Sequence, residues 1–215
     1  MTTLELETQH GPARAHLRLP ARTSACLVLG HGAGGGVGAR DLVAVTEAAL
    51  ARGVAVALVE QPYRVAGRRS PGPAHQLDAA WTAVVAQLLA GELRGLQLIA
   101  GGRSSGARVA CRTAEAAGAT GVLCLAFPLL PPQRPGAVEP RSRLAELDAV
   151  RVPKLVVQGA NDRFGIPPPC PQRAVVVVPG DHRLTADLAA VAGAVEQWLG
   201  RIIRPRRAAS AAADR

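Results

Sequence analysis

A serine, an aspartate and a histidine each follow a different apolar segment of the chain. Ser104 lies in the segment GRSSG, Asp162 ends the segment GAND, and His182 ends the segment PGDH. A serine hydroxyl becomes a good nucleophile when a neutral imidazole accepts its proton, and a carboxylate orients that imidazole. The three residue types, in the chain order Ser, Asp, His, therefore favour acyl transfer through a catalytic triad.

The segment GRSSG at 102–106 has the G-x-S-x-G spacing of a nucleophile elbow. Glycines at both flanks let the chain turn sharply between a strand and a helix. The spacing selects Ser104 over Ser105, because Arg103 and Ala107 would occupy the flanking positions around Ser105. By itself the pattern is common, and a serine here could cap the helix instead. The pattern becomes stronger evidence because Asp162 and His182 also follow predicted strands, in the chain order of a triad.

Two other carboxylates could supply the acid of the triad. Asp181 is the sequence neighbour of His182 and would point away from the imidazole in an extended loop, so we interpret it as structural. Asp148 lies in the segment LAELD, which has the pattern of a helix, and it ranks second to Asp162.

The glycine-rich segment at 30–36, GHGAGGG, has two interpretations. It matches the G-x-G-x-x-G pattern of a dinucleotide site, and Glu60 ends the following strand as a ribose-binding acid would. However, the helix does not begin directly after the third glycine. In addition, two short strands precede the strand that would have to be the first of a dinucleotide-binding fold. An oxyanion hole uses backbone N–H groups after the nucleophile and in a loop after an early strand. We therefore expect donors at Ser105 and at Ala33 or Gly34.

Three further side chains could contact a substrate. His31 is expected to brace the glycine loop, with a substrate contact as the alternative. Arg103 could attract an anionic substrate, although an arginine at this point of an elbow more often braces neighbouring loops. Tyr63 and Arg64, together with the proline-rich segment 128–143, would line a shallow site for small or extended acyl esters or thioesters.

Strand and helix patterns alternate along the chain. Strands that are apolar throughout and separated by helices indicate a parallel sheet covered on both faces. The two short leading strands would lie at an edge of that sheet. The predicted strands are 4–8, 15–19, 25–30, 54–59, 96–100, 121–127, 154–157 and 174–178, and the predicted helices are 41–52, 75–90, 105–117 and 185–199.

The length of 215 residues and a hydrophobic content of 48% fit one domain. We expect residues 1–203 to form a single α/β domain and residues 204–215 to form a disordered basic tail. A cap domain is not expected, because only about 26 residues, rich in proline, separate Phe127 from the strand that carries the acid. The segment 61–73 is predicted to be a loop.

Charge and composition indicate which classes of partner to expect. The net charge of +9 comes almost wholly from dispersed arginines, and the chain has only two Trp, one Tyr and two Phe for base stacking, so we expect no nucleic-acid partner. The acidic amino terminus is unlike a signal peptide, and the most apolar segment is interrupted by Pro128, so we expect a cytoplasmic protein without a membrane partner.

Cysteine and histidine spacing predicts no metal or cofactor. Three of the four cysteines, Cys26, Cys111 and Cys124, lie in apolar strand or helix segments, where cysteine behaves as a small buried hydrophobic residue. The fourth, Cys170, lies in a proline-rich loop. The five histidines are scattered singly, without the spacing of zinc ligands.

Five segments together resemble the small cap-less α/β-hydrolases of the dienelactone-hydrolase-like group: HGAG, QPY, GGRSSG, GAND and GDH. This group includes a hydrolase-like domain in a subunit of a chromatin acetyltransferase complex. The resemblance covers about residues 25–199. It implies an α/β-hydrolase fold, a mostly parallel sheet with helices on both faces and no cap domain.

The same resemblance implies Ser104, Asp162 and His182 as the triad and Ala33 and Ser105 as oxyanion donors. True dienelactone hydrolases use cysteine at the elbow, so their lactone substrate does not carry over to this chain.

The sequence therefore predicts a serine hydrolase, without a cofactor, that cleaves an ester or thioester of a small acyl substrate through an acyl-enzyme. Two alternatives stay open: a hydrolase-fold binding or scaffold module with little turnover, and a dinucleotide-binding protein. The natural substrate and the oligomeric state do not follow from the residues.

Overall fold

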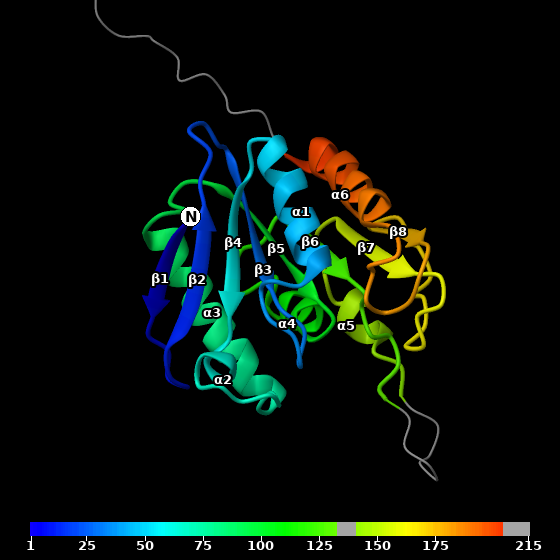
Figure 1. The fold of residues 1–215 in the computed structure, drawn as a ribbon, viewed down its shortest axis with the longest axis horizontal. Coiled ribbons are helices and arrows are strands. Elements are labelled where there is room, and N and C mark those ends of the chain that lie inside the picture. The colour runs from blue at the N-terminus through cyan, green and yellow to red at the C-terminus, as the bar shows by residue number, and fades with distance from the viewer. Residues whose placement is uncertain (133–140, 204–215) are drawn as a thin grey trace, which may run out of the picture.

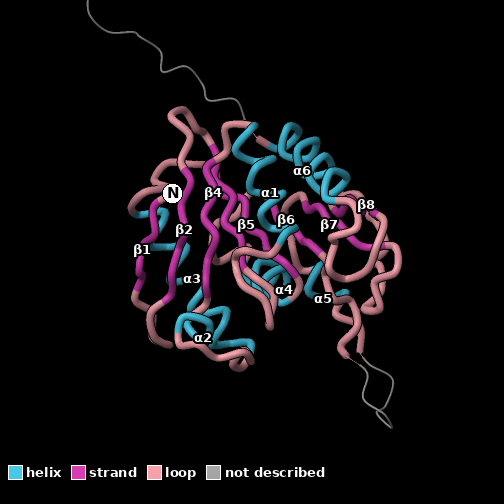
Figure 2. The backbone as a smooth tube through the Cα atoms, viewed as in Figure 1, coloured by secondary structure: helices cyan, strands magenta, loops and turns pink. Residues whose placement is uncertain are grey.

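The computed structural model describes residues 1–132 and 141–203. Its eight strands form one sheet in the order β1-β2-β4-β3-β5-β6-β7-β8 (Figures 1 and 2). Strand β2 is antiparallel to both of its neighbours, and the other pairs are parallel. The strands are β1 (Thr2–Leu6), β2 (Ala13–Arg18), β3 (Ala25–Gly30), β4 (Ala55–Glu60), β5 (Gln97–Arg103), β6 (Gly121–Leu125), β7 (Lys154–Gly159) and β8 (Arg173–Val178).

Helices cover both faces of the sheet, as the sequence predicts. Helices α1 and α6 pack against each other on one face, and α3 and α4 lie together on the other (Figure 1). The helices are α1 (Arg40–Ala51), α2 (Pro62–Val65), α3 (Ala74–Ala90), α4 (Ser105–Thr113), α5 (Leu144–Asp148) and α6 (Leu188–Ile202).

Strand β3 shows why the strands of this sheet are continuous apolar segments in the sequence. Cys26 and Val28 belong to the core on the α3 and α4 side, while Leu27 and Leu29 belong to the core on the α1 and α6 side. Because both faces are buried, every position of the strand is apolar. Strand β3 ends at Gly30, which pairs with Gly102 of β5, so the glycine loop begins beside the elbow.

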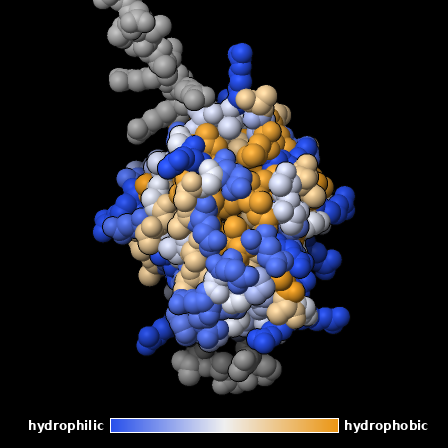
Figure 3. All heavy atoms as spheres, turned by 90° about the vertical axis from the view of Figure 1, so that its left-hand side faces the viewer, coloured by the Kyte–Doolittle hydropathy of each residue, from blue (hydrophilic) through white to orange (hydrophobic). Residues whose placement is uncertain are grey.

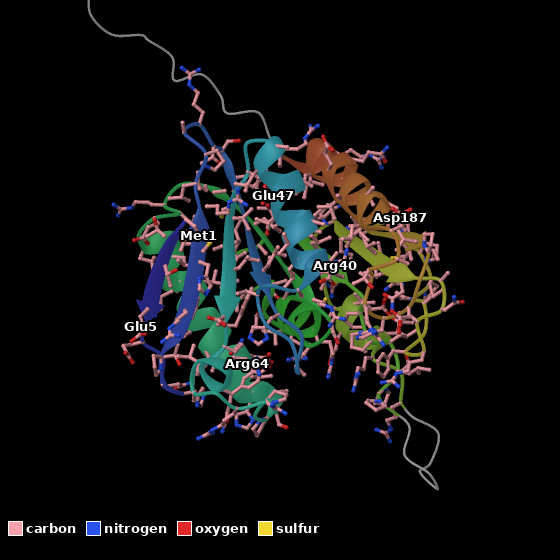
Figure 4. All side chains as sticks on the ribbon, in the orientation of Figure 1. Met1, Glu5, Arg40, Glu47, Arg64 and Asp187 are labelled. Carbon is pink, nitrogen blue, oxygen red and sulfur yellow. The ribbon has the colours of Figure 1, made fainter. Side chains whose placement is uncertain are left out.

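Three helix ends differ from the prediction by three residues or more, and one of them is the end of α6, at Ile202 rather than at 199. Helix α4 ends at Thr113 rather than at 117, since the chain passes through a turn to Gly118 at φ +67°. Helix α6 begins at Leu188 rather than at 185, because the Asp187 side chain accepts a hydrogen bond from the N–H of Ala190 at 2.8 Å and caps the helix there (Figure 4).

Three other segments also correct the prediction. Strand β5 extends to Arg103 instead of 100. Strand β6 ends at Leu125 instead of 127, because Ala126 adopts a left-handed φ of 48°. Residues Pro62–Val65, predicted as loop, form the one-turn helix α2, with Pro62 at its first position. A helix this short has no apolar periodicity that a sequence pattern can detect.

The exposed edge strand β1 carries one charged residue, Glu5, which pairs with Arg14 of β2. The Arg14 side chain donates to Glu5 Oε2 at 3.4 Å on its outer surface (Figure 4). On the face that includes this edge, apolar residues form several patches among polar ones (Figure 3). Charged side chains on an edge strand disfavour pairing with another chain.

Three cysteines are buried, as predicted: Cys26, Cys111 and Cys124. Burial raises the pKa of Cys26 to about 12. Within residues 1–132 and 141–203, no helix is both long and apolar enough to span a membrane. The predicted tail at 204–215 and residues 133–140 of the proline-rich segment lie outside the described residues, and the division of the chain into one domain and a tail stays a prediction.

Candidate active site

Ser104 stands at a strained turn between β5 and α4. Its φ of 51° and ψ of −109° are unfavourable for a residue with a side chain, and such strain persists only where the surrounding structure enforces it. Close packing of backbones supplies that constraint. A Cβ atom would lie 2.6 Å from the Gly30 carbonyl oxygen if added to Gly102, and 2.4 Å from it if added to Gly106. Both flanking positions therefore require glycine.

The structure brings Ser104, His182 and Asp162 together. His182 Nε2 lies 2.9 Å from Ser104 Oγ, and His182 Nδ1 lies 2.7 Å from Asp162 Oδ2. The side chain of Asp162 is fully buried, while that of His182 is 18% exposed. Because an ionised carboxylate can only accept, Nδ1 carries the ring proton and Nε2 is left to accept from the serine hydroxyl.

Close backbone contact also positions the loops of the acid and the base. A Cβ on Gly159, the last residue of β7, would lie 2.4 Å from the Asp181 carbonyl oxygen. Gly180 adopts φ +104°, which a residue with a side chain rarely does. These two glycines let the loop after β8 lie directly against the loop after β7.

The carboxylate of Asp162 has two further hydrogen bonds. The Gln158 amide donates to Oδ2 at 2.7 Å, and the backbone N–H of Phe164 donates to Oδ1 at 2.9 Å. The Phe164 ring packs edge-on against the His182 ring, with centroids 4.6 Å apart. Neither Gln158 nor Phe164 was identified from the sequence. The one available signal was a polar glutamine that directly follows the apolar residues 155–157 of β7.

The two rival carboxylates have other partners. Asp148 binds the Arg173 guanidinium at 2.7 Å, and Asp181 accepts from the backbone N–H of Arg183 at 2.9 Å. Among the three carboxylates considered, the structure places Asp162 against the imidazole.

Arg103 braces the elbow. Its Nε donates to Asp41 Oδ2 at 2.9 Å, and its Nη2 donates to the His182 carbonyl at 3.0 Å. Burial raises the pKa of Asp41, and the Arg103 guanidinium opposes that shift. The side chain thus connects β5, the first turn of α1 and the loop of the base. A contact between Arg103 and substrate stays a prediction.

His31 and Tyr63 hold the glycine loop through its backbone. His31 Nε2 accepts from the N–H of Gln61 at 3.2 Å, so Nδ1 carries the proton and donates to the Gly32 carbonyl at 2.8 Å. Burial lowers the pKa of His31. The Tyr63 hydroxyl donates to the Ala33 carbonyl at 2.9 Å, and burial raises the pKa of Tyr63 to about 12. Substrate contacts by either residue stay predictions.

The predicted oxyanion donors lie in two segments that adjoin Ser104. Ser105 is the first residue of α4, where backbone N–H groups have no acceptor within the helix. A Cβ on Gly32 would lie 3.6 Å from Ser104 Cβ, so the glycine loop reaches the nucleophile. Ala33 and Gly34 follow Gly32 in that loop. The arrangement can offer two backbone donors to an oxygen bound at Ser104.

The eight-stranded sheet and the Ser-His-Asp arrangement define the class of α/β hydrolases. Residues 23–184 match the family described as alpha/beta hydrolase domain, and the chain belongs to this family. No curated protein matches the chain in sequence.

Three solved structures illustrate the fold. An α/β serine hydrolase without a lid from Xanthomonas campestris has a TM-score of 0.74 at 20% identity and covers 93% of this chain and 94% of its own. Dienelactone hydrolase from Anabaena variabilis has a TM-score of 0.72 at 16% identity, covering 94% and 98%. The esterase domain of a Rhodothermus marinus protein has a TM-score of 0.67 at 16% identity, covering 93% and 98%.

At these identities, the structural similarity shows the α/β-hydrolase fold and leaves the substrate open. The dienelactone-hydrolase-like resemblance agrees with one of the three structures, whereas the resemblance to a chromatin-complex subunit stays a prediction.

Proposed function

We propose that the protein is a serine hydrolase that cleaves ester or thioester bonds of small acyl substrates. The observation that carries the proposal is the continuous chain of hydrogen bonds from Ser104 Oγ through His182 to a fully buried Asp162. The strained elbow adds support, because it holds the serine hydroxyl toward the imidazole in a conformation that costs energy.

The proposed reaction has two halves. His182 Nε2 takes the proton of Ser104 as Oγ attacks the acyl carbon, and the resulting oxyanion binds the N–H groups of Ser105 and of Ala33 or Gly34. His182 then gives the proton to the leaving alcohol or thiol, and the acyl group stays on Ser104. Water attacks this ester by the same route and releases the acid. Asp162 stays ionised and stabilises the imidazolium throughout.

The acyl group is proposed to lie in an open site. The chain is predicted to line that site with Tyr63, Arg64 and the segment 128–143, of which residues 133–140 lie outside the described residues. Deleting residues 131–140 should change the chain-length preference among p-nitrophenyl esters. An unchanged preference would remove this segment from the acyl site.

The test is hydrolysis of p-nitrophenyl acetate and butyrate and of an acetyl thioester by the wild type and two serine variants. Ser104→Ala should lower kcat at least about 1,000-fold. Ser105→Ala is the matched control, since it removes the adjacent hydroxyl and keeps the backbone N–H, and it should retain most of the activity. Turnover that survives in Ser104→Ala would contradict the assignment of the nucleophile.

The dinucleotide alternative is not favoured by the structure. Helix α1 begins at Arg40, five residues beyond Gly35, the third glycine of the pattern. The Glu60 carboxylate lies 2.9 Å from His16 Nε2 in a neighbouring strand. A folded wild type without any turnover would favour the scaffold alternative instead. The small-molecule partner and the cytoplasmic location are parts of the same proposal.

A further inference from the structure

Gln158 occupies an unusual position near the end of β7. Its side chain is fully buried, and its amide nitrogen lies among three acceptors: Asp162 Oδ2 at 2.7 Å, the Gly165 carbonyl at 3.0 Å and the Phe127 carbonyl at 3.1 Å. Since all three neighbours are acceptors, the NH₂ group must face them. Its Oε1 has no hydrogen-bond partner within the described part of the chain.

This arrangement shows what the amide supplies. A buried acceptor without a partner, such as Gln158 Oε1, is unfavourable, so the side chain is not optimised for its own hydrogen bonding. An apolar side chain of the same size would remove that unpaired oxygen. It would also leave the Gly165 carbonyl without its donor. Asp162 Oδ2 and the Phe127 carbonyl would each lose one of two donors, keeping His182 Nδ1–H and the Leu129 N–H respectively. The amide therefore serves the groups around it, and Asp162 is the charged one.

Asp162 Oδ2 accepts hydrogen bonds from both Gln158 and His182. Together with the Phe164 N–H on Oδ1, these donors fix the rotation of the Asp162 carboxylate, with Oδ2 directed at the imidazole. The bond to Gly165 holds the residue next to Phe164, whose ring packs against His182. One amide thus connects the acid and the aromatic neighbour of the base.

We propose that Gln158 is a positioning residue of the triad: it aligns Asp162 toward His182 and limits the negative charge that the carboxylate presents to the imidazole. The inference rests on the proposed function, because alignment of the acid affects turnover only if His182 acts as the base.

The test is Gln158→Met, which keeps the length of the side chain and removes both donors. We expect kcat to fall about 10- to 100-fold with KM changed less than about threefold, as for loss of a hydrogen bond to a charged group. The carboxylate would then interact more strongly with the imidazolium, so the acidic limb of the pH profile should move to higher pH. The charged groups around this loop are unchanged in the variant. Arg103 donates to the His182 carbonyl, Arg163 lies over the Phe164 ring, and Asp181 and Arg183 flank His182 in the chain.

The matched control is Val156→Ala, a fully buried position on the same strand with no polar contact to the triad. It should lower the melting temperature and leave the pH profile in place. Should Gln158→Met fail to fold, Gln158→Asn retains an amide but withdraws it by about one C–C bond, ~1.5 Å, and should move the acidic limb in the same direction. A Gln158 variant that changes stability alone, like the control, would overturn the proposal.

An NMR titration of the His182 ring separates this inference from the proposed function, because it requires no turnover. In the Ser104→Ala background, adding Gln158→Met should move the His182 titration to higher pH. The same titration curve with and without Gln158 would overturn the positioning role even in an active enzyme. Absence of turnover in the wild type, with the NMR shift present, would count against the hydrolase function alone.

Discussion

Ser104, the proposed nucleophile, and its hydrogen-bonded partners His182 and Asp162 are held in two different ways. Around Ser104, backbone packs on backbone, and a Cβ added at Gly106 would lie 2.4 Å from a carbonyl oxygen of β3. Around Asp162 and His182, the loops are also in close contact, but buried side-chain hydrogen bonds add to that contact. The amide nitrogen of Gln158 faces three acceptors there.

Because of this difference, substitutions in the two regions should affect folding and activity differently. Steric contact between backbones leaves no room for a small change, so a substitution at the elbow should affect folding and activity together. A hydrogen-bonded carboxylate can be replaced by a group of the same shape, so a substitution on the acid side should affect activity far more than folding. The largest expected effects test this contrast, and the smaller ones refine it.

Asp162→Asn should have the largest effect. The amide has nearly the shape of the carboxylate but cannot hold the imidazole in the tautomer that accepts the serine proton, and kcat should fall about 10⁴-fold. The melting temperature should change by only a few degrees, for a cost of about 1 kcal/mol. Ester hydrolysis and thermal unfolding check both expectations. If Asp162→Asn were mostly unfolded, the acid side would be as sensitive to substitution as the elbow, and the contrast between the two regions would be wrong.

Gly106→Ala should reduce stability and activity together. The added methyl group would overlap the Gly30 carbonyl, so β3 and α4 must separate. We expect the free energy of unfolding to fall by at least about 3 kcal/mol, measured by urea denaturation. Wild-type stability combined with lost activity would show that the elbow is not held by sterics.

His31 should give a smaller, pH-dependent effect. Burial lowers its pKa, so the folded protein holds the ring neutral while the unfolded chain takes up a proton below about pH 6.5. Stability should therefore be independent of this group above pH 6.5 and decrease as the pH falls toward the lowered pKa. The slope from this one group is at most about 1.4 kcal/mol per pH unit.

His31→Gln should remove that part of the pH dependence. Urea midpoints at pH 7 and pH 5 for the wild type and the variant isolate it from the other histidines, which both proteins share. Equal slopes in the two proteins would indicate that His31 is protonated in the folded state.

Gly34→Ala should have the smallest effect. No heavy atom outside its chain neighbours lies within 4 Å of a Cβ at this position, and its φ is not in the left-handed region. We expect a change in the free energy of unfolding within about 0.5 kcal/mol and retained ester hydrolysis. Loss of activity at unchanged stability would indicate that substrate fills the space beside Gly34.

The sequence was sufficient to place the three triad residues at one site. Each of them follows a strand of a parallel sheet, and the carboxyl ends of such strands meet at one edge, so the pattern of apolar segments brought Ser104, Asp162 and His182 together. The glycine loop followed from the same rule.

The supporting contacts could not be predicted in this way. Arg103 of β5 pairs with Asp41 of α1, and the amide of Gln158 in β7 faces three acceptors in loops. The geometry of these contacts depends on how the separate elements pack. The short helix at Pro62–Val65 and the Asp187 cap of α6 were missed because one turn of helix or one side-chain cap leaves only a weak local pattern.

Labelling with a fluorophosphonate probe tests the central claim most directly, since the probe reacts with an activated serine whatever the natural substrate is. The wild type and Ser105→Ala should be labelled, peptide mapping should locate the adduct on Ser104, and Ser104→Ala should not react. A folded wild type that is never labelled, or an adduct on another residue, would contradict the assignment of Ser104 as the nucleophile.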